Sequence, residues 1–89
     1  MVGQFARSIA GHDKGNLYII IGEDKDSLIL SDGRLKKVEK PKKKNRKHIQ
    51  IIKKDCNVLV AEKIANGDKA VNEAIKRAIK LYEQEDKNV

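Results

Sequence analysis

The chain has 89 residues and a formal net charge of +7, from 20 Lys and Arg against 13 Asp and Glu. A chain of this length forms one domain with a small core, because it buries only about 60 to 65 % of the surface that its unfolded form exposes. Trp is absent, and the aromatic residues are Phe5, Tyr18 and Tyr82. This scarcity argues against modules that read single-stranded RNA by stacking successive bases on an aromatic sheet.

The first part of the chain predicts two strands joined by a glycine turn. Residues 4–9 alternate imperfectly between apolar and polar side chains, which fits a half-buried edge strand. Residues 17–21 form a continuous β-branched and aromatic run, which favours a buried strand. The turn between them has two glycines, which supply the positive φ angles of a tight reversal, around three polar residues: Gly11, His12, Asp13, Lys14 and Gly15.

A third strand is predicted at residues 27–31, after a polar turn. It is followed directly by Asp32 and Gly33, a strong two-residue signal for a β-hairpin. We therefore expect residues 34–38 to return antiparallel to the third strand.

The next segment combines a proline with a dense run of cations. Pro41 cannot donate to a sheet ladder, and the charges of residues 42–47 repel one another. We expect a mobile loop there, or a sheet edge that becomes ordered on binding. Residues 48–52 resume a strand pattern that can close the sheet against the first strand.

After residue 55 the apolar period becomes helical. A helix face is formed by Val71, Ala74, Ile75, Ala78, Ile79 and Tyr82. Asp68 or Asn72 is expected to cap its N-terminus. Residues 58–65 are compatible with a strand or a helix, and we favour a short helix that ends at Asn66 and Gly67.

The predicted fold class is mainly β with a C-terminal helical part. Residues 1–54 are expected to form a small β-barrel that includes a basic arm, residues 34–47. Residues 55–89 are expected to add one or two helices packed on that barrel, so that the whole chain is a single structural unit.

The basic arm concentrates the charge of the protein. Nine of the 20 cations lie in it against one carboxylate, Glu39, so the arm carries +8 and the rest of the chain sums to −1. A localised patch suits a polyanion, because each neutralised phosphate releases condensed counterions. We expect RNA as the partner, with these contacts: Arg7, Lys14, Arg34, Lys36, Lys37, Lys40, Lys42, Lys43, Lys44, Arg46 and Lys47.

Other charged or reactive residues can be interpreted without a ligand. The arm itself could be a solvated loop, but a solvated surface usually intersperses both signs of charge. Lys76, Arg77 and Lys80 form a smaller patch that we interpret as a solvated helix face. His48 is interpreted as a strand residue and Cys56 as a small apolar residue without chemistry.

No cofactor, metal or catalytic activity is expected. A single cysteine and two scattered histidines give neither a disulfide nor a metal-binding spacing. No nucleophile lies near a convincing base, so we expect no enzyme. Apolar runs are too short for a signal peptide or a membrane span, and a cytoplasmic protein that is monomeric when free is expected.

The glycine turn and its flanking strands resemble the KOW motif of RNA-associated proteins. With Asp32-Gly33-Arg34, the Lys-rich run and the C-terminal helix, the chain resembles the eukaryotic-type fourteenth large-subunit ribosomal protein and its short bacterial relatives. The resemblance implies an SH3-like barrel that contacts ribosomal RNA or ribosomal proteins. Residues 16–18 depart from the universal bacterial KOW ribosomal protein, which has further glycines and basic residues there, so the main contact is expected in the arm.

The function predicted from these observations is non-enzymatic RNA binding by a ribosomal or ribosome-associated protein. An alternative is a KOW or SH3-like module that binds a protein partner of the transcription or translation machinery. Attachment to anionic membranes is disfavoured, because the chain lacks the lipidation site or amphipathic anchor that supplies a second signal.

Overall fold

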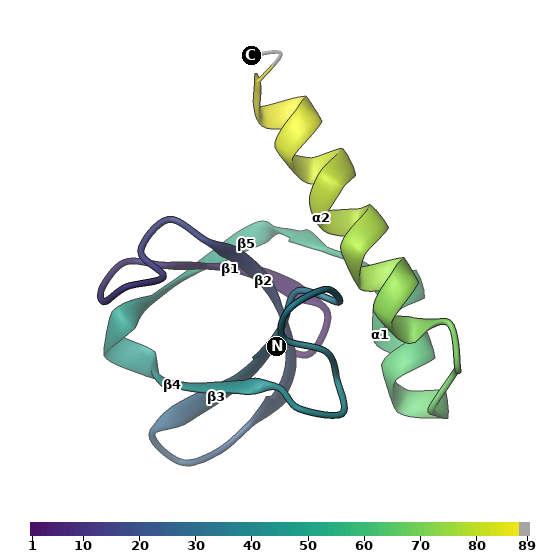
Figure 1. Cartoon of the computed structure of the whole chain (residues 1–89), viewed down its shortest axis with the longest axis horizontal. Coiled ribbons are helices and arrows are strands. Elements are labelled where there is room, and N and C mark those ends of the chain that lie inside the picture. Colours follow the sequence, from purple (N-terminus) through teal and green to yellow (C-terminus); the bar gives the residue numbers. More distant parts are fainter. Residues whose placement is uncertain (88–89) are drawn as a thin grey trace.

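The computed structural model describes residues 1–87, and within them the side chains of all residues except 53–56, 86 and 87. In this range the chain forms five strands and two α-helices (Figure 1). Their bounds are β1 Gln4–Ser8, β2 Leu17–Glu23, β3 Ser27–Ser31, β4 Lys42–Asn45, β5 Ile49–Cys56, α1 Val58–Asn66 and α2 Val71–Lys87, with a 3₁₀ turn, η1 Arg46–His48, between β4 and β5.

The strands form one antiparallel sheet in the order β4-β3-β2-β1-β5. The expected pairing of the last strand with the first is confirmed, with Ala6 opposite Ile51. β1 therefore lies inside the sheet and not at the edge that its weak alternation indicates. The edge strands β4 and β5 are joined by η1 alone, so the sheet curls round until its two edges meet at one end (Figure 1). Within the described residues no ladder joins them, and the sheet is not closed.

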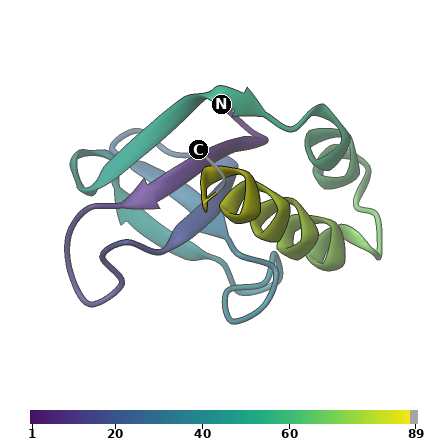
Figure 2. The same cartoon turned by 90° about the horizontal axis from the view of Figure 1, so that it is seen from above.

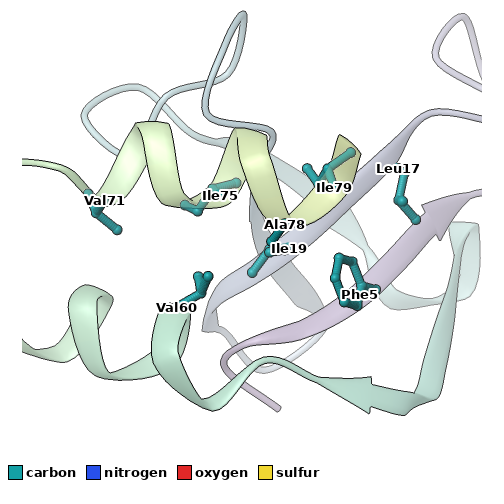
Figure 3. Packing of buried hydrophobic residues seen from close by; sticks show 8 residues of the cluster. All are labelled: Phe5, Leu17, Ile19, Val60, Val71, Ile75, Ala78 and Ile79. Atoms are coloured by element: carbon teal, nitrogen blue, oxygen red, sulfur yellow. The ribbon is translucent and has the colours of Figure 1, made fainter. Parts of the chain in front are cut away.

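The curled sheet has an inner and an outer apolar face. The inner face is filled by Ala6, Tyr18, Ile20, Leu28, Leu30 and Ile49. The outer face is covered by α2, with α1 beside it (Figures 2 and 3). There, Phe5 of β1 stacks on Tyr82 of α2 with ring centroids 4.7 Å apart, an arrangement that adds to the gain from area burial. Both aromatic rings are therefore used to attach the helix to the sheet.

Both helices confirm the sequence interpretation. Asn57 caps α1 by accepting a hydrogen bond from the Val60 amide at 3.0 Å, and Gly67 ends it in the left-handed conformation. Just before α2, the Asp68 carboxylate accepts from the Ala70 amide at 2.7 Å. The alternative cap, Asn72, is wrong because that residue lies inside α2 and its side chain binds another segment. No helix in residues 1–87 is long and apolar enough to cross a membrane.

The predicted hairpin after β3 is wrong. Residues 34–38 form a loop, and β3 pairs with β4. β4 lies in the segment expected to be a mobile loop or a sheet edge, and it is an edge strand. The reason is local: the Asp32 carboxylate accepts hydrogen bonds from the amides of Arg34 and Lys36 at 2.9 and 2.8 Å. These amides are the donors that a returning strand would need. The chain therefore makes a wide excursion, residues 32–41, before it pairs.

Candidate nucleic-acid interface

Strand β4 places its lysines alternately on the two faces of the sheet. Lys44 lies opposite Leu28 and Lys42 opposite Leu30, and both leucines are fully buried in the inner core. Residues directly opposite each other in a sheet share a face. Lys42 and Lys44 are therefore directed to the inner side of the curl.

The inner lysines meet a carboxylate from the glycine turn. Asp13 pairs with Lys44 through Oδ1, and its Oδ2 lies 3.4 Å from the Lys42 ammonium. Hydroxyl groups complete the arrangement, because Ser8 Oγ and Tyr18 Oη donate to the two carboxylate oxygens at 2.9 Å each. We call these five residues the Asp13 cluster.

Lys44 has no unused bonding capacity in this cluster. Its ammonium also donates to Ser8 Oγ at 2.7 Å and to the Ala10 carbonyl at 2.6 Å, and its side chain is only 11 % exposed. A lysine has three N–H donors, and here all three have acceptors. Lys44 is thus a structural residue that joins β4 to the glycine turn.

The cluster shifts the ionisation of two side chains. Burial by itself raises the pKa of Asp13, but hydrogen bonds from Lys44, Ser8 and Tyr18 and the charge of Lys42 outweigh it and hold the pKa well below its usual value. Burial, together with the adjacent Asp13 carboxylate, raises the pKa of the Tyr18 hydroxyl. Asp13 is therefore ionised and Tyr18 neutral at physiological pH.

The outward cations of the same segment also have counterions. Lys43 binds Asp24 at 2.8 Å, and Arg46 binds Glu23 at 3.0 Å and the Asp24 carbonyl at 3.1 Å. The hydrogen bond from Lys43 lowers the pKa of Asp24. Acidic residues avoid the basic arm in the sequence, but the fold brings three of them against β4 and η1.

A different set of cations lacks such partners. Most of them lie in the excursion between β3 and β4, residues 32–41, which we call the basic loop. Among the residues whose side chains are described, no carboxylate lies within 4.0 Å of the ammonium or guanidinium groups of these exposed residues: Arg34, Lys36, Lys37, Lys40 and Lys47.

The basic loop is braced internally. Besides the two amides bound by Asp32, the Lys36 carbonyl accepts hydrogen bonds from the Asp32 amide at 3.0 Å and from Ser31 Oγ at 2.6 Å. The Gly33 amide donates to the same Ser31 hydroxyl oxygen at 3.1 Å. The first half of the loop is thus held in one conformation.

The loop is also attached to α2, and the two lie side by side in Figure 2. Asn72 accepts from the Val38 amide at 2.9 Å, and its Nδ2 donates to both carboxylate oxygens of Glu39 at 2.9 and 3.0 Å. Gly33 has a φ of +73°, and a Cβ there would lie 2.2 Å from the Asn72 carbonyl oxygen. The cations of the loop are therefore presented from a fixed backbone, which improves the geometric precision of a binding site.

A groove of about 530 Å³ runs between the loop, the end of the glycine turn and α2. Arg34 from the loop and Lys76 and Lys80 from α2 line it, although Lys76 also pairs with Glu73 at 3.1 Å. Lys76 and Lys80, taken from the sequence as a solvated helix face, thus join the loop in one basic surface. The i, i+4 spacing of Lys76 and Lys80 indicates in the sequence that they share one face of α2, but nothing in the sequence places the basic loop beside that face.

The glycine turn has the backbone that the sequence predicts, with φ angles of +85° at Gly11 and +94° at Gly15. Arg7 donates to the Gly15 carbonyl at 3.1 Å and braces the turn. His12 and Lys14 are exposed on it. Of the turn's charged residues, Lys14 is directed to solvent, whereas Asp13 is bound by β4.

Two further residues singled out in the sequence are His48 and Cys56. The His48 carbonyl accepts from the Ile9 amide at 2.9 Å, but His48 lies in η1 and not in the predicted strand. Cys56 ends β5, and its side chain lies outside the described ones. Within the described residues no group of three or more His, Cys, Asp or Glu is arranged to hold a metal ion.

Comparison of the sequence with known protein families and with curated proteins finds no match.

Proposed function

We propose that this protein is a non-enzymatic RNA-binding protein of the ribosome or its associated factors, and that its curled sheet is an SH3-like barrel of the KOW type. RNA phosphates bind the basic loop and the adjoining face of α2. Lys14, which precedes Gly15 of the groove lining, extends this surface, whereas β4 serves to hold the sheet together. The protein acts in the cytoplasm, where ribosomes assemble and work.

One observation carries the proposal: the cations of the basic arm, residues 34–47, divide into two sets. The lysines of β4 have carboxylate partners, and the Asp13 carboxylate among these is largely buried. The cations of the basic loop are exposed, have no carboxylate partner among the described side chains, and stand on a braced backbone. A cation that already has a counterion must lose it before it can bind a phosphate, which reduces the net gain. Phosphates therefore select the loop.

Salt dependence of RNA binding tests this division. The probe is a fluorescently labelled single-stranded RNA of mixed sequence, titrated by anisotropy from 50 to 200 mM salt. The variant Lys36→Gln/Lys37→Gln removes two loop cations. The control Lys25→Gln/Lys69→Gln removes two exposed cations from the β2–β3 turn and the α1–α2 connection, which likewise have no carboxylate within 4.0 Å among the described side chains. The net charge changes equally in both.

The loop variant is expected to flatten the slope of log affinity against log salt by about 1.4, from about 0.7 for each lost phosphate contact on a single strand. The control should keep the wild-type slope. Equal slopes for the two variants would mean that only net charge matters, and the loop would not be the contact surface.

Association with ribosomes is tested on sucrose gradients of lysates from cells that express the tagged chain. The wild type should sediment with ribosomal particles, and Lys36→Gln/Lys37→Gln should shift toward the top of the gradient. Recovery of a protein complex that survives nuclease treatment would favour the protein-interaction alternative instead.

A further inference from the structure

We propose that the groove between the basic loop and α2 holds one unpaired nucleotide of single-stranded RNA, with its base against Leu35 and its flanking phosphates at Arg34 and Lys80. This inference rests on the proposed RNA-binding function and specifies its ligand. It assigns the groove a role beyond phosphate contact.

Leu35 is the first observation. The residue is 75 % exposed, the highest value among the exposed large apolar residues of the described chain. It lies between Arg34 and Lys36, whose amides are both bound by Asp32, so its exposure belongs to a braced loop. An apolar side chain displayed among cations gains by contact with the flat, apolar face of an anionic ligand, which a nucleotide base provides.

The groove is the second observation. Its volume of about 530 Å³ lies within the range of roughly 300 to 1,000 Å³ that is usual for small-ligand sites. Leu35 and Ile79 give it apolar walls, and Arg34 and Lys80 stand beside them. Ile79 belongs to the face of α2 that packs on the sheet (Figure 3), so this wall is rigid.

The groove also contains two carboxylates, Asp32 and Glu83. Carboxylates repel phosphates but accept hydrogen bonds from the N–H groups of bases. Asp32 already binds two loop amides through Oδ1, whereas Glu83 is exposed on α2. This mixture of charges fits a whole nucleotide, with the base edge toward the carboxylates, better than it fits a free phosphate.

The three aromatic residues, which would be the usual side chains to stack on a base, are not available in the groove. Tyr18 is buried in the inner core, and Phe5 and Tyr82 stack on each other between the sheet and α2. Leu35 is then the apolar contact that the basic loop offers to a base. A duplex does not expose base faces, and the major groove of A-form RNA is too narrow and deep for side chains to read. The groove therefore selects unpaired RNA.

The test compares Leu35→Ser with Leu59→Ser. Leu59 is 72 % exposed on α1 and does not line the groove, so the control removes a similar exposed leucine elsewhere. Both variants should unfold at the wild-type temperature, because exposed positions contribute little to stability. The probes are a labelled single-stranded 12-nucleotide RNA and the same strand annealed to its complement, each titrated at 50 and 150 mM salt.

Leu35→Ser is expected to weaken binding of the single strand about fivefold at both salt concentrations, from the loss of roughly half a leucine's burial. Its affinity for the duplex should stay at the wild-type value. Leu35→Tyr should bind the single strand at least as tightly as the wild type, because a ring stacks on any base. Leu59→Ser should match the wild type on both probes.

Three results would overturn the inference. If Leu35→Ser binds the single strand like Leu59→Ser, the base does not contact Leu35, and a flattened salt slope for Lys36→Gln/Lys37→Gln would still uphold phosphate binding. If Leu35→Ser weakens both probes equally, the groove does not select unpaired RNA. If the wild type binds neither probe, the proposed function fails, and the inference fails with it.

Discussion

Asp13 and Lys44 are 31 positions apart in the chain, yet their side chains form an ion pair in which each is only 11 % exposed. The pair connects the glycine turn between β1 and β2 to the edge strand β4. It explains how a strand of sequence Lys-Lys-Lys-Asn stays in a sheet despite its mutual repulsion. The inward lysines are neutralised by Asp13 and the outward one by Asp24.

Breaking the pair from one side should destabilise the protein strongly. Asp13→Asn leaves Lys44 largely buried without a counterion, and we expect a loss of about 3 kcal/mol in the free energy of unfolding. Urea denaturation measures this loss. The double variant Asp13→Asn/Lys44→Met should lose less than the sum of the single variants, since it removes the unpaired charge as well. Strict additivity would show that the two side chains are not coupled.

Acid should weaken the wild type through the same carboxylate. The pKa of Asp13 is lowered in the folded protein, so its contribution to stability is complete above its unfolded pKa of about 3.9 and is lost as pH falls toward the folded pKa. The stability advantage of the wild type over Asp13→Asn should therefore be constant from pH 7 to about pH 5 and shrink below about pH 4. Thermal unfolding at a series of pH values provides the measurement. An advantage that stays constant down to pH 2 would rule out this linkage.

Gly33 should be far less tolerant of alanine than Gly15, although both have positive φ. A Cβ at Gly33 meets the Asn72 carbonyl oxygen at 2.2 Å, whereas a Cβ at Gly15 meets nothing within 4 Å. Gly15→Ala should cost only the conformational strain, about 1 to 2 kcal/mol. Gly33→Ala must also separate the basic loop from α2, and we expect at least about 3 kcal/mol. Similar losses in urea denaturation would show that the loop is not closely packed on the helix.

Asn72 should act as a positioning residue for the basic loop. Asn72→Asp keeps an acceptor for the Val38 amide but replaces the donor to Glu39 with a second carboxylate. We expect a loss of about 1 to 3 kcal/mol in stability and weaker RNA binding, because the loop is no longer held. Adding Glu39→Gln should restore most of both, since it removes the repulsion. Failure of this rescue would mean that the contact between Asn72 and Glu39 does not position the loop.

The sequence predicts most of the elements because their signals are local. The buried run of β2, the glycine turn and the apolar face of α2 are each read from neighbouring residues, and the structure contains all three. The partner of β3 was not predictable in this way. Asp32 captures two amides after the turn, and β4 depends on carboxylates that are distant in the chain.

The distance in the chain between the cations and their counterions also limits what the sequence says about the interface. Charge density identifies residues 34–47 as one basic arm, but the counterions of its second half are Asp13, Glu23 and Asp24. Only folding brings these acids against β4, and only folding places the loop on Lys76 and Lys80. The sequence therefore locates the charge but cannot show which cations remain free for a ligand.

Ultraviolet crosslinking of the wild-type chain to single-stranded RNA, followed by mass spectrometric mapping of the crosslinked peptides, would locate the RNA-binding surface on the protein. We expect crosslinks in the basic loop, at residues 34–40, and on α2 around Lys76 and Lys80, with little signal from Lys42 and Lys44. Crosslinks concentrated in β4, with the basic loop unmodified, would contradict the proposed interface and would show that the ion-paired strand is the contact surface.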